Sequence, residues 1–253
     1  MRRSQKLTYY NGRRYDVDIV DQMIRHYSTK SRTHRRRNFI LQLCEELRAP
    51  YMSSRNTANA RKPAELCVNR EDNTIKKRTK CSGFKENLHA IFCLAENSVG
   101  PLATRPDDVI TLYSGKTVEV NNTDAEGRLV LGDGVAYAKK DLQATTIVDM
   151  ATLTGAQGVA TGRYHAALLT NNEDYERKAV SAGKLSGDLI HPMPFVPELH
   201  FCEFNSSHAD MKNSVSDNAC GAVSCAGLFI GSHIGFDYEG KWLHIDMAKP
   251  CYQ

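Results

Sequence analysis

NNTDAEGRLVLGDG, residues 121–134, joins a segment with strand character to a segment with helix character. The residues just before it, 116–120, read KTVEV and are rich in β-branched side chains, which favour strands. After the loop the apolar residues recur at helical spacing, at Leu129, Leu131, Val135 and Ala138. The stretch therefore predicts a strand, a polar loop and a helix in succession, as in an α/β fold.

The chain beyond residue 82 repeats this alternation of short apolar runs and amphipathic segments. The patterns predict strands at residues 88–96, 145–151, 164–171 and 241–247. They predict helices at residues 172–187, 197–204 and 224–236. Such alternation indicates an α/β fold class, with a mixed, largely parallel sheet and flanking helices.

The charge of the chain is distributed unevenly. Residues 1–80 carry 20 Lys and Arg against 8 Asp and Glu, whereas residues 81–253 carry 13 against 21. In the basic part, the spacing of apolar residues predicts helices at residues 16–27 and 38–48, followed by a loop-rich join. We therefore expect a basic, partly helical and loop-rich region at residues 1–81 and an α/β domain at residues 82–253.

The composition also limits the class of protein. No segment approaches the roughly 20 consecutive apolar residues of a membrane helix, and the N-terminus has no apolar signal core, so we expect a cytoplasmic protein without a membrane partner. The eight cysteines form no C-x-x-C pair, which indicates reduced thiols. Nucleic acid is not the expected partner, because aromatic residues are not interleaved with basic ones. A module that binds an acidic partner through residues 35–37 stays open as an alternative function.

The polar loop after residue 120 carries the candidate site residues. Asp124 and Glu126 are two positions apart, so their side chains leave the same face while the chain is extended. Carboxylate oxygens suit Mg²⁺, Mn²⁺ or Zn²⁺, and one carboxylate can bridge two ions in a hydrolytic site. Arg128 then offers a planar donor group to an anion at the start of the helix. By spacing alone, a loop carboxylate pair that forms salt bridges with the arginine is the favoured interpretation.

The longer motif around these residues resembles a known family. NTDAEGRL, residues 122–129, is similar to the hallmark octapeptide of the leucine (cytosol) aminopeptidase family. Residues 87–108 are similar to the animal branch of probable aminopeptidase-like proteins. The resemblance covers roughly residues 82–250 and continues through VDMATLTGAQ (148–157), GRYHAALLTN (162–171), HPMPFVPELHFCEF (191–204), ADMKNS (209–214) and WLHIDMAKP (242–250).

The resemblance implies a metallohydrolase that removes N-terminal residues from peptides and assembles as a homohexamer. It implies two divalent metal ions, Mn²⁺ or Zn²⁺ and possibly Mg²⁺, with Asp124 as a ligand and Glu126 as a bridge between them. In the same scheme Arg128 is catalytic and holds a bicarbonate-like anion that acts as the general base. The substrate-binding residues would be Asn122, Thr152, Leu153 and Gly155.

Several segments of the family pattern have no match in this sequence. The family's G-K-G-x-x-[FY]-D-[ST]-G-G and M-K-x-D-[MC]-G-G-A-A segments, which supply further metal ligands and a catalytic lysine, have no counterpart here. Neither does the family's final Gly-rich loop and helix. We therefore expect a partial aminopeptidase catalytic domain at residues 82–253. Two functions follow as alternatives, a dinuclear-metal aminopeptidase and a catalytically inactive relative that acts as a fold or assembly subunit.

Overall fold

The computed structural model describes residues 9–10, 13–14, 38–47, 87–96, 103–215 and 221–250. Its main feature is a six-stranded sheet in the order β4-β3-β7-β11-β8-β9. β4, β3, β7 and β11 run parallel to one another, β11 and β8 pair antiparallel, and β9 is parallel to β8. The strands are β3 (Asn38–Leu47), β4 (Asn87–Glu96), β7 (Thr146–Ala151), β8 (Ala166–Thr170), β9 (Ile190–Pro192) and β11 (Lys241–Asp246).

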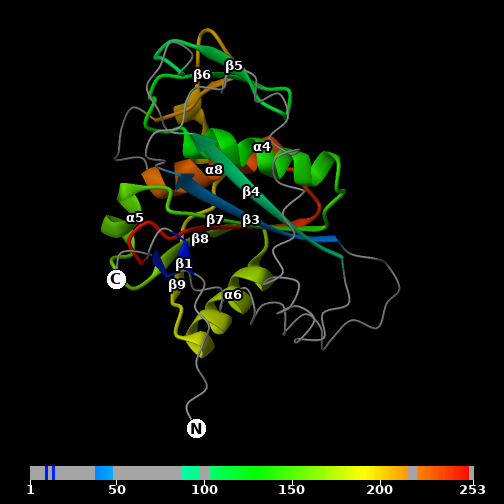
Figure 1. Cartoon of the computed structure of the whole chain (residues 1–253), viewed down its shortest axis with the longest axis vertical. Helices are drawn as coiled ribbons and strands as arrows, with labels where there is room; N and C mark the ends of the chain where they lie inside the picture. Colours follow the sequence, from blue (N-terminus) through cyan, green and yellow to red (C-terminus); the bar gives the residue numbers. More distant parts are fainter. Residues whose placement is uncertain are drawn as a thin grey trace.

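A smaller sheet lies apart from the main one, as Figure 1 shows. It has three strands in the order β10-β6-β5, and these are β5 (Val109–Thr111), β6 (Thr117–Glu119) and β10 (Met211–Lys212). Two short strands, β1 (Tyr9–Tyr10) and β2 (Arg13–Arg14), form a separate antiparallel pair. The helical elements are α4 (Gly127–Lys140), α5 (Gly155–Ala160), α6 (Glu173–Ser186), α7 (Pro197–His200), the 3₁₀ helix η2 (Phe201–Phe204) and α8 (Ala222–Ile234).

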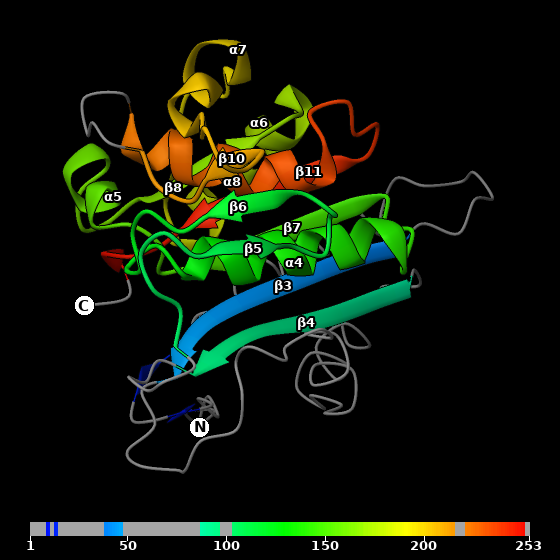
Figure 2. The ribbon, with the colours of Figure 1, turned by 90° about the horizontal axis from the view of Figure 1, so that it is seen from above.

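The elements form four layers, in the order small sheet, α4 with α8, main sheet and α6 (Figures 1 and 2). Alternation along the central strands explains this order, because successive side chains leave opposite faces. On β7, Val148 and Met150 pack against α6, whereas Ile147 and Ala151 pack on the side of α4 and α8. Every residue of β7 is buried, as expected for a strand covered on both faces. A third apolar cluster fills the space between the small sheet and the two helices.

Two glycines allow α8 to approach the main sheet closely. Gly227 and Gly231 are one turn apart and face β11. A Cβ atom at Gly227 would lie 3.0 Å from His244 Cδ2, and one at Gly231 would lie 3.1 Å from the ring of Trp242. The helix therefore rests directly on the two aromatic side chains of β11. These side chains belong to the polar network described below.

The structure confirms the α/β class, the mixed and largely parallel sheet, and the strands expected beyond residue 82. The prediction of a helix at residues 38–48 is wrong, because β3 is a strand there and pairs with both β4 and β7. A short apolar run fits either periodicity, and pairing partners on both sides decide for the strand. The helix expected at residues 16–27 and the basic run at residues 35–37 lie outside the described residues. The domain boundary near residue 82 stays a prediction.

Asp133 on α4 provides a test of how burial in this layer affects a carboxylate. Its carboxylate accepts a hydrogen bond from the Tyr113 N–H at 2.6 Å, and burial raises its pKa to about 6. The unfolded value is about 3.9, so the folded state holds the proton more tightly. The contribution of this group to stability is therefore complete below about pH 4 and is lost as the pH rises through about 6.

We predict that Asp133→Asn raises the free energy of unfolding at pH 7 by about 1–2 kcal/mol, because the amide still accepts from Tyr113 without burying a charge. The gain should vanish near pH 4, where the wild-type carboxyl is protonated. Urea unfolding of both proteins at pH 4, 5, 6 and 7 measures the difference. A difference that is the same at pH 4 and pH 7 would contradict the prediction.

Candidate active site

The carboxylate loop, residues 121–126, connects β6 to α4 and carries both predicted metal ligands. Asp124 is exposed and Glu126 is half-buried. The loop turns back on itself at Asn122, whose side-chain oxygen accepts from the Asp124 N–H at 2.9 Å and whose carbonyl accepts from the Ala125 N–H at 3.2 Å. The carbonyl of Glu126 then accepts from Leu129 and Val130, which starts α4. The two carboxylates therefore lie at the N-terminal end of a helix.

Arg128 lies in the first turn of α4 and brings a positive charge into the interior. Its Nη1 donates to the backbone carbonyl of Asn213 at 3.1 Å, whereas its Nε is buried and has no hydrogen-bond partner among the residues that the structure describes. Burial lowers the pKa of Arg128 to about 10, although the neighbouring Cys225, Asp246 and Glu126 act in the opposite direction. The guanidinium therefore stays charged at neutral pH. Its unpaired Nε is a donor available to an anion.

Asn213 holds the carboxylate loop from the side of the small sheet. It is fully buried directly after β10. Its side-chain oxygen accepts from the N–H groups of Asn121 and Asn122, and its side-chain nitrogen donates to the carbonyls of Asn122 and Ala125. The loop is thus fixed through its main chain, and none of these bonds uses a carboxylate of the loop.

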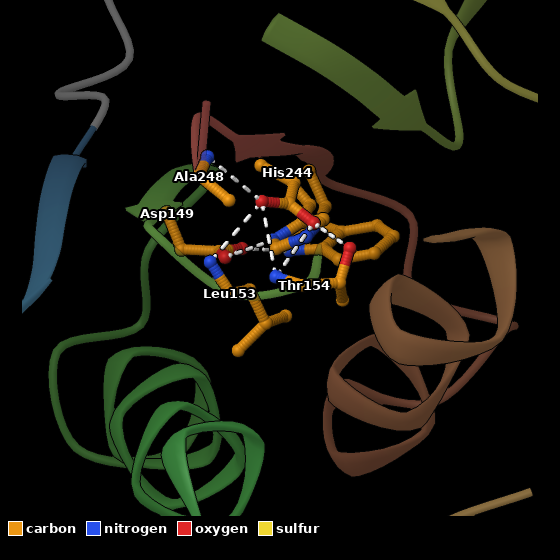
Figure 3. A network of polar contacts seen from close by, with 7 residues as sticks. Asp149, Leu153, Thr154, His244 and Ala248 are labelled. Carbon is orange, nitrogen blue, oxygen red and sulfur yellow. Dashed lines mark hydrogen bonds and ion pairs between the residues drawn. The ribbon is translucent and has the colours of Figure 1, made fainter. Parts of the chain in front are cut away.

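The threonine loop, residues 152–155, follows β7 and contains three of the predicted substrate-binding residues. One buried carboxylate holds it, that of Asp246 at the end of β11. This carboxylate accepts from the N–H of Leu153 at 3.1 Å, and from the N–H and hydroxyl of Thr154 at 3.1 and 2.6 Å. It also accepts from the N–H of Ala248 at 3.2 Å (Figure 3). Thr154 in turn caps α5 by accepting from the N–H of Gln157.

The strands beneath these loops contain a second buried polar group. Asp149 of β7 and His244 of β11 are paired residues on neighbouring parallel strands. The Nδ1 atom of His244 lies 2.5 Å from Asp149, whose other oxygen accepts from the indole N–H of Trp242 at 2.7 Å. Burial alone would lower the pKa of His244, but the charge and hydrogen bond of Asp149 outweigh it and the net shift is upward. His244 is thus a buried imidazole that is hydrogen-bonded to its strand partner.

In the same network, opposing effects act on the pKa of the Asp246 carboxyl. The net shift of its carboxyl pKa is upward, because burial outweighs the opposing effects of His244 and of the hydrogen bonds from the threonine loop. The donors converge on both of its oxygens, an arrangement that suits the ionised, acceptor-only form. Negative charge at Asp149 and Asp246 is therefore balanced by His244 and by Arg128, which is electrostatically coupled to both His244 and Asp246.

The predicted site residues thus fall on two loops, one between β6 and α4 and one at the carboxyl end of β7, and on the first turn of α4. The loops are neighbours, because a Cβ atom at Gly127 would lie 3.3 Å from Leu153 Cδ1. Such a position is where open α/β sheets bind ligands. Within the ranges that the structure describes, no group of three His, Cys, Asp or Glu side chains is arranged to hold a metal ion. Asp124 and Glu126 have the right donor chemistry for a divalent ion, but they are too few to hold two.

Sequence reasoning missed the residues that support the site, namely Asn213, Asp246, Asp149 and His244. For Asp149, His244 and Asp246 a signal was present in TTIVDMA and WLHIDM, where polar residues interrupt apolar strand-like runs, whereas ADMKNS, which contains Asn213, is not such a run. A buried polar residue within such a run needs hydrogen-bond partners, but the partners cannot be identified from spacing.

Comparison with known proteins places this arrangement among aminopeptidases. Residues 74–253 match the model of the cytosol aminopeptidase family, catalytic domain. Over 170 residues, 67% of this chain, it is 68% identical to "Probable aminopeptidase NPEPL1" of Homo sapiens and 58% identical to "Leucine aminopeptidase 1" of Caenorhabditis elegans. These matches cover 32% and 35% of the relatives, so the chain spans about a third of the length of the curated relatives it matches.

Solved structures give the same result. The fold is similar to that of the Caenorhabditis elegans leucine aminopeptidase, with a TM-score of 0.65 and 54% identity over 68% of this chain and 37% of that one. It is also similar to the apo leucyl aminopeptidase of Trypanosoma brucei, with a TM-score of 0.70 and 38% identity over 85% of this chain and 41% of that one.

In the part of the chain described here, no helix has the length and apolar character that crossing a membrane requires.

Asp246 and Asp210 offer a matched test of the threonine loop. Each accepts hydrogen bonds from both the N–H and the hydroxyl of one threonine, Thr154 for Asp246 and Thr117 for Asp210. Asp246 is buried and Asp210 is exposed. In Asp246→Asn the new NH₂ group faces donors, and a buried N–H or hydroxyl loses its acceptor.

We predict that Asp246→Asn lowers the free energy of unfolding by about 3 kcal/mol. Asp210→Asn should cost only a small fraction of that, because water replaces the lost bonds there. Urea unfolding followed by the fluorescence of Trp242, the one tryptophan of the chain, measures both. Equal losses in the two variants would show that the buried carboxylate does not anchor the loop.

Proposed function

Because the chain belongs to the cytosol aminopeptidase family, we propose that it takes part in the metal-dependent removal of N-terminal residues from peptides. The observation that carries the proposal is the juxtaposition of the carboxylate loop with a buried arginine and the threonine loop. Each of these three parts has a separate task in hydrolysing a peptide bond.

Asp124 and Glu126 would hold a divalent ion, Mn²⁺, Zn²⁺ or Mg²⁺, through their carboxylate oxygens. Such an ion, when bound, polarises the scissile carbonyl and activates water at neutral pH. Two carboxylates fill only part of the coordination sphere of one ion, and a pair of ions needs more ligands than the described residues bring together. Asp124 is exposed in the carboxylate loop, so its carboxylate is accessible to an incoming ion.

Arg128 would bind a bicarbonate-like anion or the negative charge that develops on the substrate. Its cation is held in place by the carbonyl of Asn213, and its Nε has no partner among the described residues. A fixed donor in a buried site stabilises charge that appears only in the transition state, without reorganising first. Its pKa of about 10 leaves it charged over the neutral pH range.

The peptide would lie along the threonine loop, with Asn122 on the opposite side. The N–H of Leu153 is used by Asp246, so the carbonyl is the main-chain group that Leu153 can offer to a peptide. At Gly155 a Cβ atom would meet nothing within 4 Å, which shows open space beside the loop. Thr152 is exposed at the start of the same loop. These residues would therefore bind the backbone of the substrate next to the scissile bond.

A second function, an inactive family member that serves as an assembly subunit, is favoured by the small number of ligands. Asp124 and Glu126 are accompanied by no third suitable side chain in the described ranges. The homohexamer that the family resemblance implies and the cytoplasmic location expected from the sequence belong to both versions of the proposal. Metal binding distinguishes the two versions.

We predict that the chain binds Mn²⁺ and that Glu126→Gln weakens the binding at least about 10-fold, because the amide removes one charged oxygen ligand. Hydrolysis of an aminoacyl anilide by the same preparation should fall at least about 100-fold. Isothermal titration with Mn²⁺ gives both the number of bound ions and the affinity. Glu198→Gln on α7, which is exposed and far along the chain from the loop, serves as the control.

Binding of Mn²⁺ that is lost in Glu126→Gln and kept in Glu198→Gln supports the metal site. Hydrolysis with the same dependence supports the aminopeptidase, and metal binding without hydrolysis supports the assembly subunit. Absence of Mn²⁺ binding, or binding that Glu126→Gln leaves unchanged, would overturn the role of the two carboxylates.

A further inference from the structure

Asn213 is unusual among the polar residues of the chain because all its hydrogen-bonding groups are used and all serve one segment. It is fully buried. Its N–H donates to the carbonyl of Glu119 at 2.9 Å, and its carbonyl accepts from Arg128 Nη1 at 3.1 Å. Its side chain binds the main chain of the carboxylate loop on both sides of the turn. Its partners therefore lie between Glu119 and Arg128.

The side chain of Asn213 joins the two ends of the carboxylate loop. Oδ1 accepts from Asn121 and Asn122 at 3.0 and 3.2 Å, before the turn. Nδ2 donates to the carbonyls of Asn122 at 2.7 Å and Ala125 at 3.3 Å, the second of which lies after the turn. An asparagine offers two acceptor sites and two donors, and all four are used here. No other side chain of similar size provides this set of groups.

We propose that Asn213 is the positioning residue of the candidate active site. Its amide sets the course of the loop that carries Asp124 and Glu126, and its carbonyl sets the place of the Arg128 guanidinium. One residue thus fixes the carboxylates and the cation relative to each other. The inference rests on the proposed function, since the geometry it maintains is that of the metal and anion groups.

The way in which the loop is held supports positioning over simple packing. The bonds from Asn213 reach only main-chain groups of the loop, so none of these bonds uses the carboxylate of Asp124 or Glu126. A further hydrogen bond stabilises the carboxylate loop, from the N–H of Ser214 to the side-chain oxygen of Asn121 at 2.9 Å. A site works only when its groups are held to within a fraction of an ångström, which a buried and fully satisfied amide achieves.

Asn171 is a matched control, because its side chain also holds a segment of the chain through hydrogen bonds to main-chain groups. Its Nδ2 donates to the carbonyls of Tyr238 and Gly240, and its Oδ1 accepts from the Trp242 N–H at 2.9 Å. Its side-chain partners all lie in the segment before and at the start of β11 rather than in the carboxylate loop. Loss of either asparagine therefore removes several hydrogen bonds to main-chain groups. Only the hydrogen bonds of Asn213 concern the candidate site.

The experiment compares Asn213→Ala and Asn171→Ala in the full chain, with Mn²⁺ alone as the probe. We expect both variants to lower the melting temperature, and only Asn213→Ala to weaken Mn²⁺ binding, by at least about 10-fold. Binding is measured by the electron paramagnetic resonance of free Mn²⁺ at a temperature where both variants are folded. Equal Mn²⁺ affinities in Asn213→Ala and the wild type, or equal weakening in both variants, would overturn the inference.

Amide hydrogen exchange separates this inference from the proposed function. In Asn213→Ala the N–H groups of Asp124 and Ala125 should exchange at least about 10-fold faster, although neither donates to Asn213. In Asn171→Ala they should not change. If the wild type binds no Mn²⁺, the metal site fails, and the exchange result alone decides whether Asn213 positions the loop. Unchanged exchange at both amides would overturn the inference.

If Asn213→Ala does not fold, Asn213→Asp and Asn171→Asp replace the alanine pair. The aspartate keeps the shape and the acceptor bonds, and it loses the donor bonds to Asn122 and Ala125. An added negative charge near a cation site would by itself strengthen Mn²⁺ binding. Weaker binding in Asn213→Asp than in Asn171→Asp therefore supports the positioning role, and unchanged amide exchange of Asp124 and Ala125 in Asn213→Asp would overturn it.

Discussion

The carboxylate of Asp246 is the interaction on which the arrangement of the candidate site depends. It is fully buried at the carboxyl end of β11, and its oxygens accept from the threonine loop and from the chain beyond β11. A buried charge is costly unless donors surround it, and here the donors come from segments far apart in the sequence. Satisfying this one group therefore forces the end of β7 and the end of β11 into a single geometry.

The carboxylate loop is likewise held by one buried polar side chain, which in this case is the neutral amide of Asn213. Asn213 binds the main chain of the loop from the small sheet, as Asp246 binds the threonine loop from the main sheet. The bonds from Asn213 and Asp246 reach mainly N–H and carbonyl groups of the two loops, and none of them uses the carboxylate of Asp124 or Glu126. Arg128 lies between the two systems, because its guanidinium donates to Asn213 and is electrostatically coupled to Asp246. A rigid support beneath exposed functional groups is what catalysis by preorganised groups requires.

The family relationship and the small number of metal ligands fit together in physical terms. The chain spans about a third of the length of the curated relatives, and it retains the layers that form the floor of the site. Arg128, the proposed anion-binding residue, and the threonine loop, the proposed substrate-side loop, are supported from within these layers. Metal binding by Asp124 and Glu126 makes a heavier demand, because Mg²⁺ and Mn²⁺ prefer about six oxygen ligands and Zn²⁺ about four ligands, numbers that two side chains do not supply.

The sequence by itself determined the α/β class, the largely parallel sheet, most strands beyond residue 82 and the family, because these depend on local periodicity and on a motif of adjacent residues. It also identified Asp124, Glu126 and Arg128, which lie within five positions. Only the tertiary structure decided that residues 38–47 form a strand, since pairing with β4 and β7 overrides a pattern that fits either element. Only the tertiary structure identified Asn213 and Asp246 as supports, because a buried polar side chain is specified by partners that lie some 90 residues away in the chain.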